Sequence, residues 1–159
     1  MTESVFPRKI MLATDGSKYS LEATKKTAQI AKMSNSDVIV VHVTEIPFLP
    51  IQKPLSGDTG PLGLGTTFET ESEEKIHANE ILVEAKQIFD NASVRTSVRL
   101  LNRSPQDNIA RIIVNEAAKE DVDLLVVGAT GRSGLETWLL GSVSEKVIRH
   151  APCPVLVVR

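Results

Sequence analysis

The chain has 159 residues, 42% of them hydrophobic, so it is about the size of one domain and can bury a substantial core. Its 18 basic and 20 acidic residues give a formal net charge of −2, and neither sign forms a long block that would favour nucleic-acid binding. The amino terminus lacks the apolar core of a signal peptide, and no segment is apolar enough to span a membrane. The single cysteine, Cys153, cannot form an internal disulfide. We therefore expect one soluble, cytoplasmic domain over residues 1–159.

The first part of the chain predicts two buried strands with a helix between them. Residues 9–15 are an apolar run that ends in the polar turn Asp15-Gly16-Ser17, and they predict the first strand. Small and apolar residues recur at helical spacing over residues 20–33 and predict the first helix. Residues 37–45 are apolar almost throughout, as expected for a second strand covered on both faces. Within it, His42 is expected to be a hydrogen-bonded interior histidine.

A long irregular segment follows, over residues 46–68. Its prolines and glycines make regular structure improbable. Loops of this length inside a compact domain are usually either functional or disordered. The sequence leaves both interpretations open: a flexible flap over a ligand, or disorder without a function.

The rest of the chain alternates helices and strands. Residues 69–90 carry apolar residues at i, i+3, i+4 and i+7, which predicts the second helix. The third strand is expected over residues 94–101, where Arg95 and Arg99 interrupt the apolar run and indicate a sheet edge. Ser104 followed by Pro105 predicts the start of the third helix. The remaining elements are a strand over residues 122–127, a helix over 142–150 and a strand over 154–159.

The resulting order, βαβαβαβαβ, predicts a doubly wound parallel α/β sheet with helices on both faces, joined by right-handed crossovers. Two strand orders are open, 3-2-1-4-5 and 2-1-3-4-5. In the first, strands 1 and 4 are neighbours and the winding reverses between them. Ligands bind beyond the carboxyl ends of the strands at such a reversal.

The stretch between the fourth strand and the fourth helix is the most distinctive. Gly128 and Gly131 are expected to allow unusual dihedral angles and the close approach of a ligand. Gly141 precedes Ser142, which has the Ser-x-x-Glu spacing of a capping box with Glu145, so the helix is expected to begin there with unpaired N–H groups facing outward. Such groups and the helix dipole favour an anion, and the whole stretch suits a polyphosphate. The alternative is that these glycines only form turns.

The pattern Gly-x2-Gly-x9-Gly-Ser resembles the nucleotide-binding signature of the universal stress protein family, in its ATP-binding branch. The resemblance covers nearly the whole chain, up to Ala151-Pro-Cys-Pro-Val-Leu-Val-Val, and implies the strand order 3-2-1-4-5. It also implies that the ligand is ATP or another adenine nucleotide, with Mg²⁺ or Mn²⁺ on the phosphates left open. The residues that would bind the nucleotide are Ala13, Thr14, Asp15, Val43, Gly128, Gly131, Arg132, Gly141, Ser142, Val143 and Ser144.

The resemblance assigns a part of the nucleotide to most of these residues. Asp15 would lie near the ribose or a base edge, Val43 against adenine, and the glycine loop near the phosphates and ribose. Residues 141–144 would offer main-chain N–H and hydroxyl groups to the phosphates. Asp15 could instead organise the turn before the first helix. Arg132 is either solvated or a phosphate clamp.

No catalytic set and no metal-ligand cluster emerges from the sequence. It has neither a P-loop nor a Gly-x-Ser-x-Gly elbow, so any ATP hydrolysis should be slow. We expect a nucleotide-dependent stress-response or signalling module that forms a homodimer through the apolar edge strand, residues 154–159. The alternatives are a slow ATPase or phosphotransferase, and an interaction module that binds no nucleotide. The sequence identifies no protein partner.

Overall fold

The computed structural model describes residues 5–44, 65–130 and 139–159, with the side chains of the second helix described from residue 73 onward. In these parts, strands and helices alternate: β1 (Lys9–Ala13), α1 (Lys18–Ser34), β2 (Asp37–Thr44), α2 (Gly65–Asn91), β3 (Thr96–Asn102), α3 (Ile109–Lys119), β4 (Leu124–Gly128), α4 (Ser142–His150) and β5 (Val155–Val158). The strands form one parallel sheet in the order β3-β2-β1-β4-β5, which confirms the order 3-2-1-4-5 and excludes the alternative.

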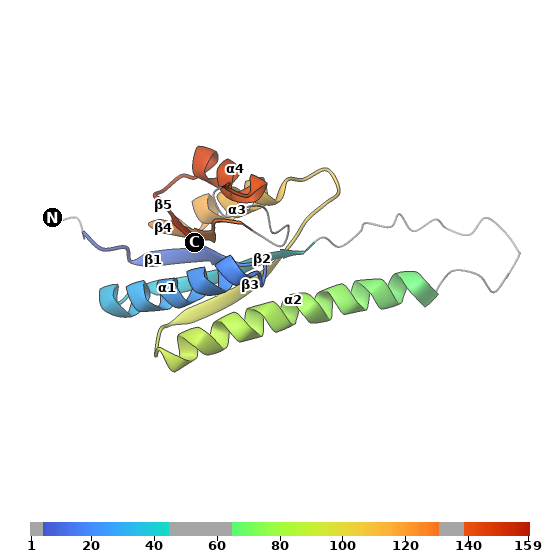
Figure 1. Ribbon diagram of the computed structural model, residues 1–159, viewed down its shortest axis with the longest axis horizontal. Helices are drawn as coiled ribbons and strands as arrows, with labels where there is room; N and C mark the ends of the chain where they lie inside the picture. Colours follow the sequence, from blue (N-terminus) through green and yellow to red (C-terminus); the bar gives the residue numbers. More distant parts are fainter. Residues whose placement is uncertain (1–4, 45–64, 131–138) are drawn as a thin grey trace, which may run out of the picture.

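The sheet lies between two helical layers. Figure 1 shows α1 and α2 on one face and α3 and α4 on the other. Successive residues of a strand point to opposite faces. In β1, Ile10 and Leu12 accordingly belong to the core that contains Phe89 of α2, whereas Met11 belongs to the core that contains Val147 of α4. Burial on both faces explains why the central strands are apolar throughout.

The two edges of the sheet are β3 and β5, as predicted. On β3, Arg99 donates hydrogen bonds from Nη1 to Glu116 Oε1 (2.7 Å) and to Glu120 Oε1 (2.6 Å), both on α3. The hydrogen bond from Arg99 lowers the pKa of Glu120 below its ordinary value. The arginine that interrupts the apolar pattern therefore ties the edge strand to the helix above it.

The predicted start of the third helix was wrong. The segment that begins at Ser104 forms a turn, in which Asp107 N–H donates to the Ser104 carbonyl (2.9 Å), and α3 begins only at Ile109. Asn108 is the N-cap, and its side chain accepts from Ala110 N–H (2.9 Å). Proline also suits the second position of a turn, and asparagine is among the best N-cap residues, so the later start satisfies both preferences.

Most of the irregular segment, residues 45–64, lies outside the described residues. The expectation that this segment forms a flap therefore stays a prediction. Residues 65–68 were also assigned to that loop, but α2 begins at Gly65 rather than at residue 69. The predicted apolar face of this helix is confirmed, since it buries Ala78, Ile81, Leu82, Ala85 and Phe89. Among the helices described here, none combines the length and the apolar character needed to cross a membrane.

Candidate functional site

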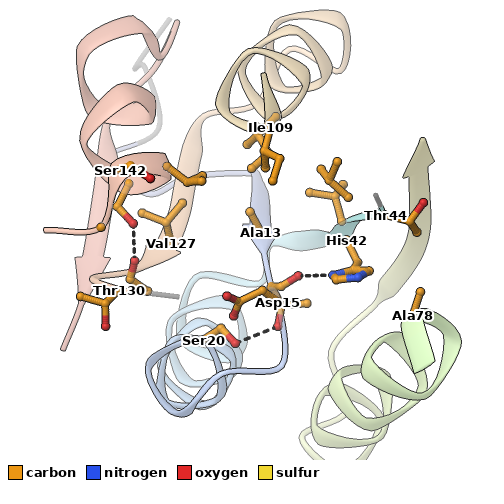
Figure 2. A pocket seen from close by; sticks show the side chains of 18 of the residues that line it. Ala13, Asp15, Ser20, His42, Thr44, Ala78, Ile109, Val127, Thr130 and Ser142 are labelled. Carbon is orange, nitrogen blue, oxygen red and sulfur yellow. Dashed lines mark hydrogen bonds between the residues drawn. The ribbon is translucent and has the colours of Figure 1, made fainter. Parts of the chain in front are cut away.

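A cavity of ≈ 490 Å³ lies at the carboxyl ends of β1, β2 and β4, where the winding of the sheet reverses. This volume is within the usual range for small-molecule sites. Figure 2 shows side chains from both helical layers around it, among them Ile109 of α3 and Ala78 of α2. The cavity is where a doubly wound sheet is expected to bind a ligand.

Nearly all of the predicted site residues meet at this cavity. Those that line it are Ala13, Thr14, Asp15, Val43, Gly128, Gly141, Ser142, Val143 and Ser144. The other two, Gly131 and Arg132, lie outside the described residues, so their assignment stays a prediction. Residues from three strand ends and one helix terminus are therefore brought together as the strand order requires.

Hydrogen bonds fix the exit of β1. The His42 Nδ1 atom lies 2.7 Å from the Thr14 carbonyl oxygen, and the Thr14 hydroxyl donates to Ser20 Oγ at 3.2 Å (Figure 2). A carbonyl oxygen can only accept, so the proton of this bond is on Nδ1. His42 is buried, with 8% of its surface exposed, which confirms the prediction of a hydrogen-bonded interior histidine. It holds the ends of β1 and β2 together beneath the cavity.

Asp15 has the turn-forming role that the sequence offered as one alternative, while its contact with a ligand stays a prediction. Its Oδ1 atom accepts from Ser17 N–H at 3.0 Å, which is the turn-forming arrangement. Gly16, inside this turn, has a φ of 76°, a value that other residues rarely adopt. Asp15 also lines the cavity. The turn thus sets the position at which this carboxylate borders the site.

The amino terminus of α4 borders the cavity without a side-chain cap. The helix begins at Ser142, as predicted, but the N-cap is Gly141, which makes no side-chain cap hydrogen bond. The predicted capping box is therefore wrong, and Glu145 instead accepts from Arg149 Nη2 (2.9 Å). The reason is a tertiary contact: Gly141 N–H donates to the Ala129 carbonyl (2.8 Å) and fixes where the helix starts.

This arrangement leaves three main-chain donors at the cavity. The first i to i−4 bond of α4 runs from Glu145 N–H to the Gly141 carbonyl (2.9 Å). The N–H groups of residues 142–144 precede it and have no acceptor within the helix. Because the same three residues line the cavity, the helix terminus offers unpaired N–H groups and the positive end of its dipole to a ligand.

The hydroxyl of Ser144 is used differently from the expectation. It donates to the Gly128 carbonyl at 2.7 Å and is buried. Its hydrogen is therefore engaged within the protein, and the main-chain N–H is the donor that Ser144 can offer. Ser142 is exposed and also lines the cavity.

The chain requires a glycine at position 128 for a reason other than the unusual dihedral angles that were expected. Its φ is not in the left-handed region, because among the described glycines only Gly16 has a positive φ. A Cβ on Gly128 would lie 2.9 Å from Ser20 N and 2.9 Å from the Tyr19 carbonyl carbon, closer than real Cβ atoms come. The missing side chain makes room for the first turn of α1, so the prediction of unusual dihedral angles here was wrong.

Several residues that the sequence reasoning missed also line the cavity: Thr44, Glu74, His77 and Thr130. Three buried oxygen atoms of this set have no hydrogen-bond partner among the described residues: Thr44 Oγ1, Glu74 Oε2 and Thr130 Oγ1. Two of these residues carried a usable signal, since Thr44 ends a strand and Thr130 lies between Gly128 and Gly131. Glu74 carried none, because its acidic surroundings fitted the first turns of a helix.

The composition of the walls decides which ligands fit. The start of α4 contributes unpaired N–H groups to the walls, and apolar residues including Val43, Ile109, Ile113 and Val127 also line the cavity. No lysine or arginine from the described parts of the chain lines the cavity. Nor do these parts contain a cluster of three His, Cys, Asp or Glu residues that could hold a metal ion. The site suits a ligand with an anionic end and an apolar ring.

The fold and this cavity define a doubly wound α/β domain with a ligand site at the switch in strand order. A sequence model of the universal stress protein family matches residues 7–159, and the chain therefore belongs to this family. It is 38% identical to universal stress protein MJ0531 of Methanocaldococcus jannaschii over 154 residues, covering 96% of this chain and 82% of that one. It is 33% identical to universal stress protein YxiE of Bacillus subtilis over 153 residues, covering 95% and 98%.

Solved structures agree on the fold. The universal stress protein UspA from Lactobacillus plantarum superposes with a TM-score of 0.77 at 22% identity, covering 98% of this chain and 100% of that one. A universal stress protein in complex with cAMP gives a TM-score of 0.67 at 26% identity, covering 97% and 98%. A family member from Arabidopsis thaliana with AMP bound gives 0.65 at 20% identity, covering 96% and 91%. Structural relatives therefore bind adenine nucleotides.

Proposed function

We propose that this universal stress protein binds an adenine nucleotide, ATP in the first place, in the cavity between β1 and β4. The observation that carries the proposal is the uncapped start of α4, whose N–H groups at residues 142–144 border the cavity. An anion there would pair with donors that nothing else in the helix satisfies. The nucleotides held by structural relatives support an adenylate as the ligand.

The distribution of groups around the cavity gives the nucleotide a direction. The phosphates would lie at the start of α4, and the ribose near the Asp15 carboxylate, an acceptor for its hydroxyl groups. The base would lie against Val43 and Ile109, beyond the ends of the central strands. A divalent cation would take most of its ligands from the phosphates, because the described protein residues form no metal cluster.

The same walls favour a binding module over an efficient enzyme. Phosphoryl transfer requires cations that neutralise the charge on the phosphates. The described cavity residues include no lysine or arginine, and the Ser144 hydroxyl is occupied by Gly128. We therefore propose a nucleotide-dependent stress-response or signalling protein of the cytoplasm, in which hydrolysis is slow.

The edge strand β5 supports the proposal of a homodimer. Its residues Val155–Val158 are all only partly buried, and β4 is its neighbour on one side only. An apolar edge strand with unpaired main-chain groups is a ready site for pairing with another chain. A second copy of β5 would cover it.

The first experiment asks whether nucleotide is bound. The purified protein is denatured, and liquid chromatography of the supernatant looks for adenine nucleotide that was carried through purification. Calorimetric titration of nucleotide-free protein with ATP, AMP and cAMP then ranks the ligands. Absence of heat with every adenylate would overturn the proposal.

The second experiment isolates the helix terminus. Ser142→Pro removes one N–H from the first turn of α4, a position at which proline is well tolerated. The preceding residue, Gly141, has φ −65° and ψ 153°, which is compatible with a following proline. Ser142→Ala is the matched control, because it removes the hydroxyl and keeps the N–H. Loss of a charge-assisted hydrogen bond should weaken ATP binding about tenfold or more in the proline variant relative to the alanine variant. Equal affinities would show that this N–H does not hold the phosphates.

A further inference from the structure

Two buried oxygen atoms of residues that line the cavity have no hydrogen-bond partner in the described chain. They are Oγ1 of Thr44, a residue only 4% exposed, and Oε2 of Glu74. A buried polar group without a partner costs free energy, and native proteins leave few of them. Both residues line the cavity, so a ligand there is positioned to supply the missing partners.

The place of these atoms follows from the elements that carry them. Thr44 ends β2, and Figure 2 shows it beside Ala78 on the side of the cavity away from Ser142, with His42 between it and Asp15. Glu74 lies four residues before Ala78 on α2, and residues at this spacing share a helix face. Ala78 is buried and lines the cavity, so Glu74 borders the same end one turn away.

The chemistry of the two groups is complementary. An ionised carboxylate only accepts hydrogen bonds, whereas a threonine hydroxyl can also donate one. A ligand that presents an N–H donor next to a hydrogen-bond acceptor can therefore satisfy both groups. The six-membered ring of adenine has this edge, because its exocyclic amino group is flanked by ring nitrogens that accept.

We propose that Glu74 and Thr44 determine base specificity by reading the amino edge of adenine. The Glu74 carboxylate accepts from the exocyclic amino group, and the Thr44 hydroxyl donates to a neighbouring ring nitrogen. This inference rests on the proposed function, since it requires a nucleotide whose phosphates lie at α4. It adds two side chains, one of them from α2, to the contacts that the family resemblance implies for the base, which are Val43 against adenine and Asp15 near either the ribose or a base edge.

Guanine is the competing base. It presents an acceptor where adenine carries its amino group, although its own ring N–H and amino group could also donate to a carboxylate. The ribose hydroxyls are a weaker alternative partner for Glu74 and Thr44, because Asp15 also lines the cavity and offers them an acceptor. The experiment therefore varies the base alone.

The test compares two ligands that differ only in the exocyclic amino group, AMP and purine riboside 5′-monophosphate, with GMP as a third. Calorimetry measures their affinities for the wild type, for Glu74→Ala and for Thr44→Val, which has nearly the shape of threonine. Glu73→Ala is the matched control, because Glu73 precedes Glu74 on α2, is exposed and does not line the cavity.

We expect the wild type and the control to prefer AMP over the purine analogue by about tenfold or more. Glu74→Ala should lose this preference and bind the analogue as tightly as the wild type does, which also shows that it is folded. Thr44→Val should weaken AMP binding severalfold.

Each remaining outcome has a distinct meaning. Equal wild-type affinities for AMP and the purine analogue would overturn the inference and leave the proposed function intact. A preference for AMP that survives in Glu74→Ala would overturn it as well. A preference for GMP that depends on Glu74 would assign these residues to guanine and contradict the inference. Failure of the wild type to bind any of the three, with no binding of ATP either, would count against the proposed function itself.

Discussion

Gly128→Ala should destabilise the fold even when no ligand is present. The added Cβ would lie 2.9 Å from Ser20 N and 2.9 Å from the Tyr19 carbonyl carbon, and 3.2 Å from Tyr19 Cβ. Carbon atoms pack best at about 3.5–4.0 Å, so α1 would have to retreat from β4 by roughly half an ångström or more. The atoms in the way are mainly main-chain atoms in the first turn of a helix, which cannot rotate aside. Overpacking of this kind costs about 1–3 kcal/mol.

The assay is urea unfolding of the nucleotide-free protein, supported by the midpoint of thermal unfolding. For a domain of this size, that cost would lower Tm by about 2–12 °C. Adding Tyr19→Ala should not restore stability, because alanine keeps the same main chain and Cβ. Nucleotide affinity should fall only to the extent that α1 moves. A variant with unchanged stability and lost ATP binding would refute this reasoning and return Gly128 to the role of admitting the ligand.

Three further changes test other parts of the structure. Asn108→Ala should reduce the free energy of unfolding, measured by urea titration, by about 1 kcal/mol, because the α3 cap is lost. Ser104→Ala, at the helix start predicted from the sequence, should change the free energy of unfolding by no more than about 0.5 kcal/mol in the same assay. Arg99 lowers the pKa of Glu120 from its ordinary value of 4.5, so the folded state gains stability above that value and loses it as the pH falls through the lowered folded-state pKa. Urea titrations between pH 3 and 7 should show this loss of stability in the wild type, and the loss should be smaller in Arg99→Gln. If the variant and the wild type have the same dependence of stability on pH, the pair does not have this role. Burial raises the pKa of the Cys153 thiol, against a smaller opposing effect of a hydrogen bond with the Leu125 main chain. Iodoacetamide should therefore alkylate native Cys153 more slowly than the unfolded chain at pH 8, and equal rates would show that the thiol is not shielded.

The sheet could be predicted because its signals are local. Each central strand is an apolar run covered on both faces, and the polar turns after β1 and β4 mark the strand exits that meet at the cavity. The order of the strands required more than the residues, since their alternation left two orders open and the family resemblance favoured one. The structure has that order.

The contact that fixes the start of α4 and the function of Gly128 could not be predicted in the same way, because both depend on residues distant in the sequence. The start of α4 is fixed by the Ala129 carbonyl, which accepts from Gly141 N–H, rather than by the Ser-x-x-Glu spacing. The need for glycine at position 128 comes from Tyr19 and Ser20, which are far away in the sequence. A spacing pattern records none of these contacts.

The carbonyl groups at the exit of β4 show how the chain builds a site whose donors are already in place. The carbonyl of Gly128 accepts from the Ser144 hydroxyl (2.7 Å), and that of Ala129 accepts from Gly141 N–H (2.8 Å). Both bonds satisfy acceptors at the exit of the strand with donors from the start of α4, and the next N–H groups of the helix have no partner among the described residues. A side-chain cap at position 141 would have satisfied one of these N–H groups and competed with an anion. A glycine at this position therefore keeps the helix terminus available, and the fixed distance between strand and helix means that a bound phosphate group need not order the terminus first.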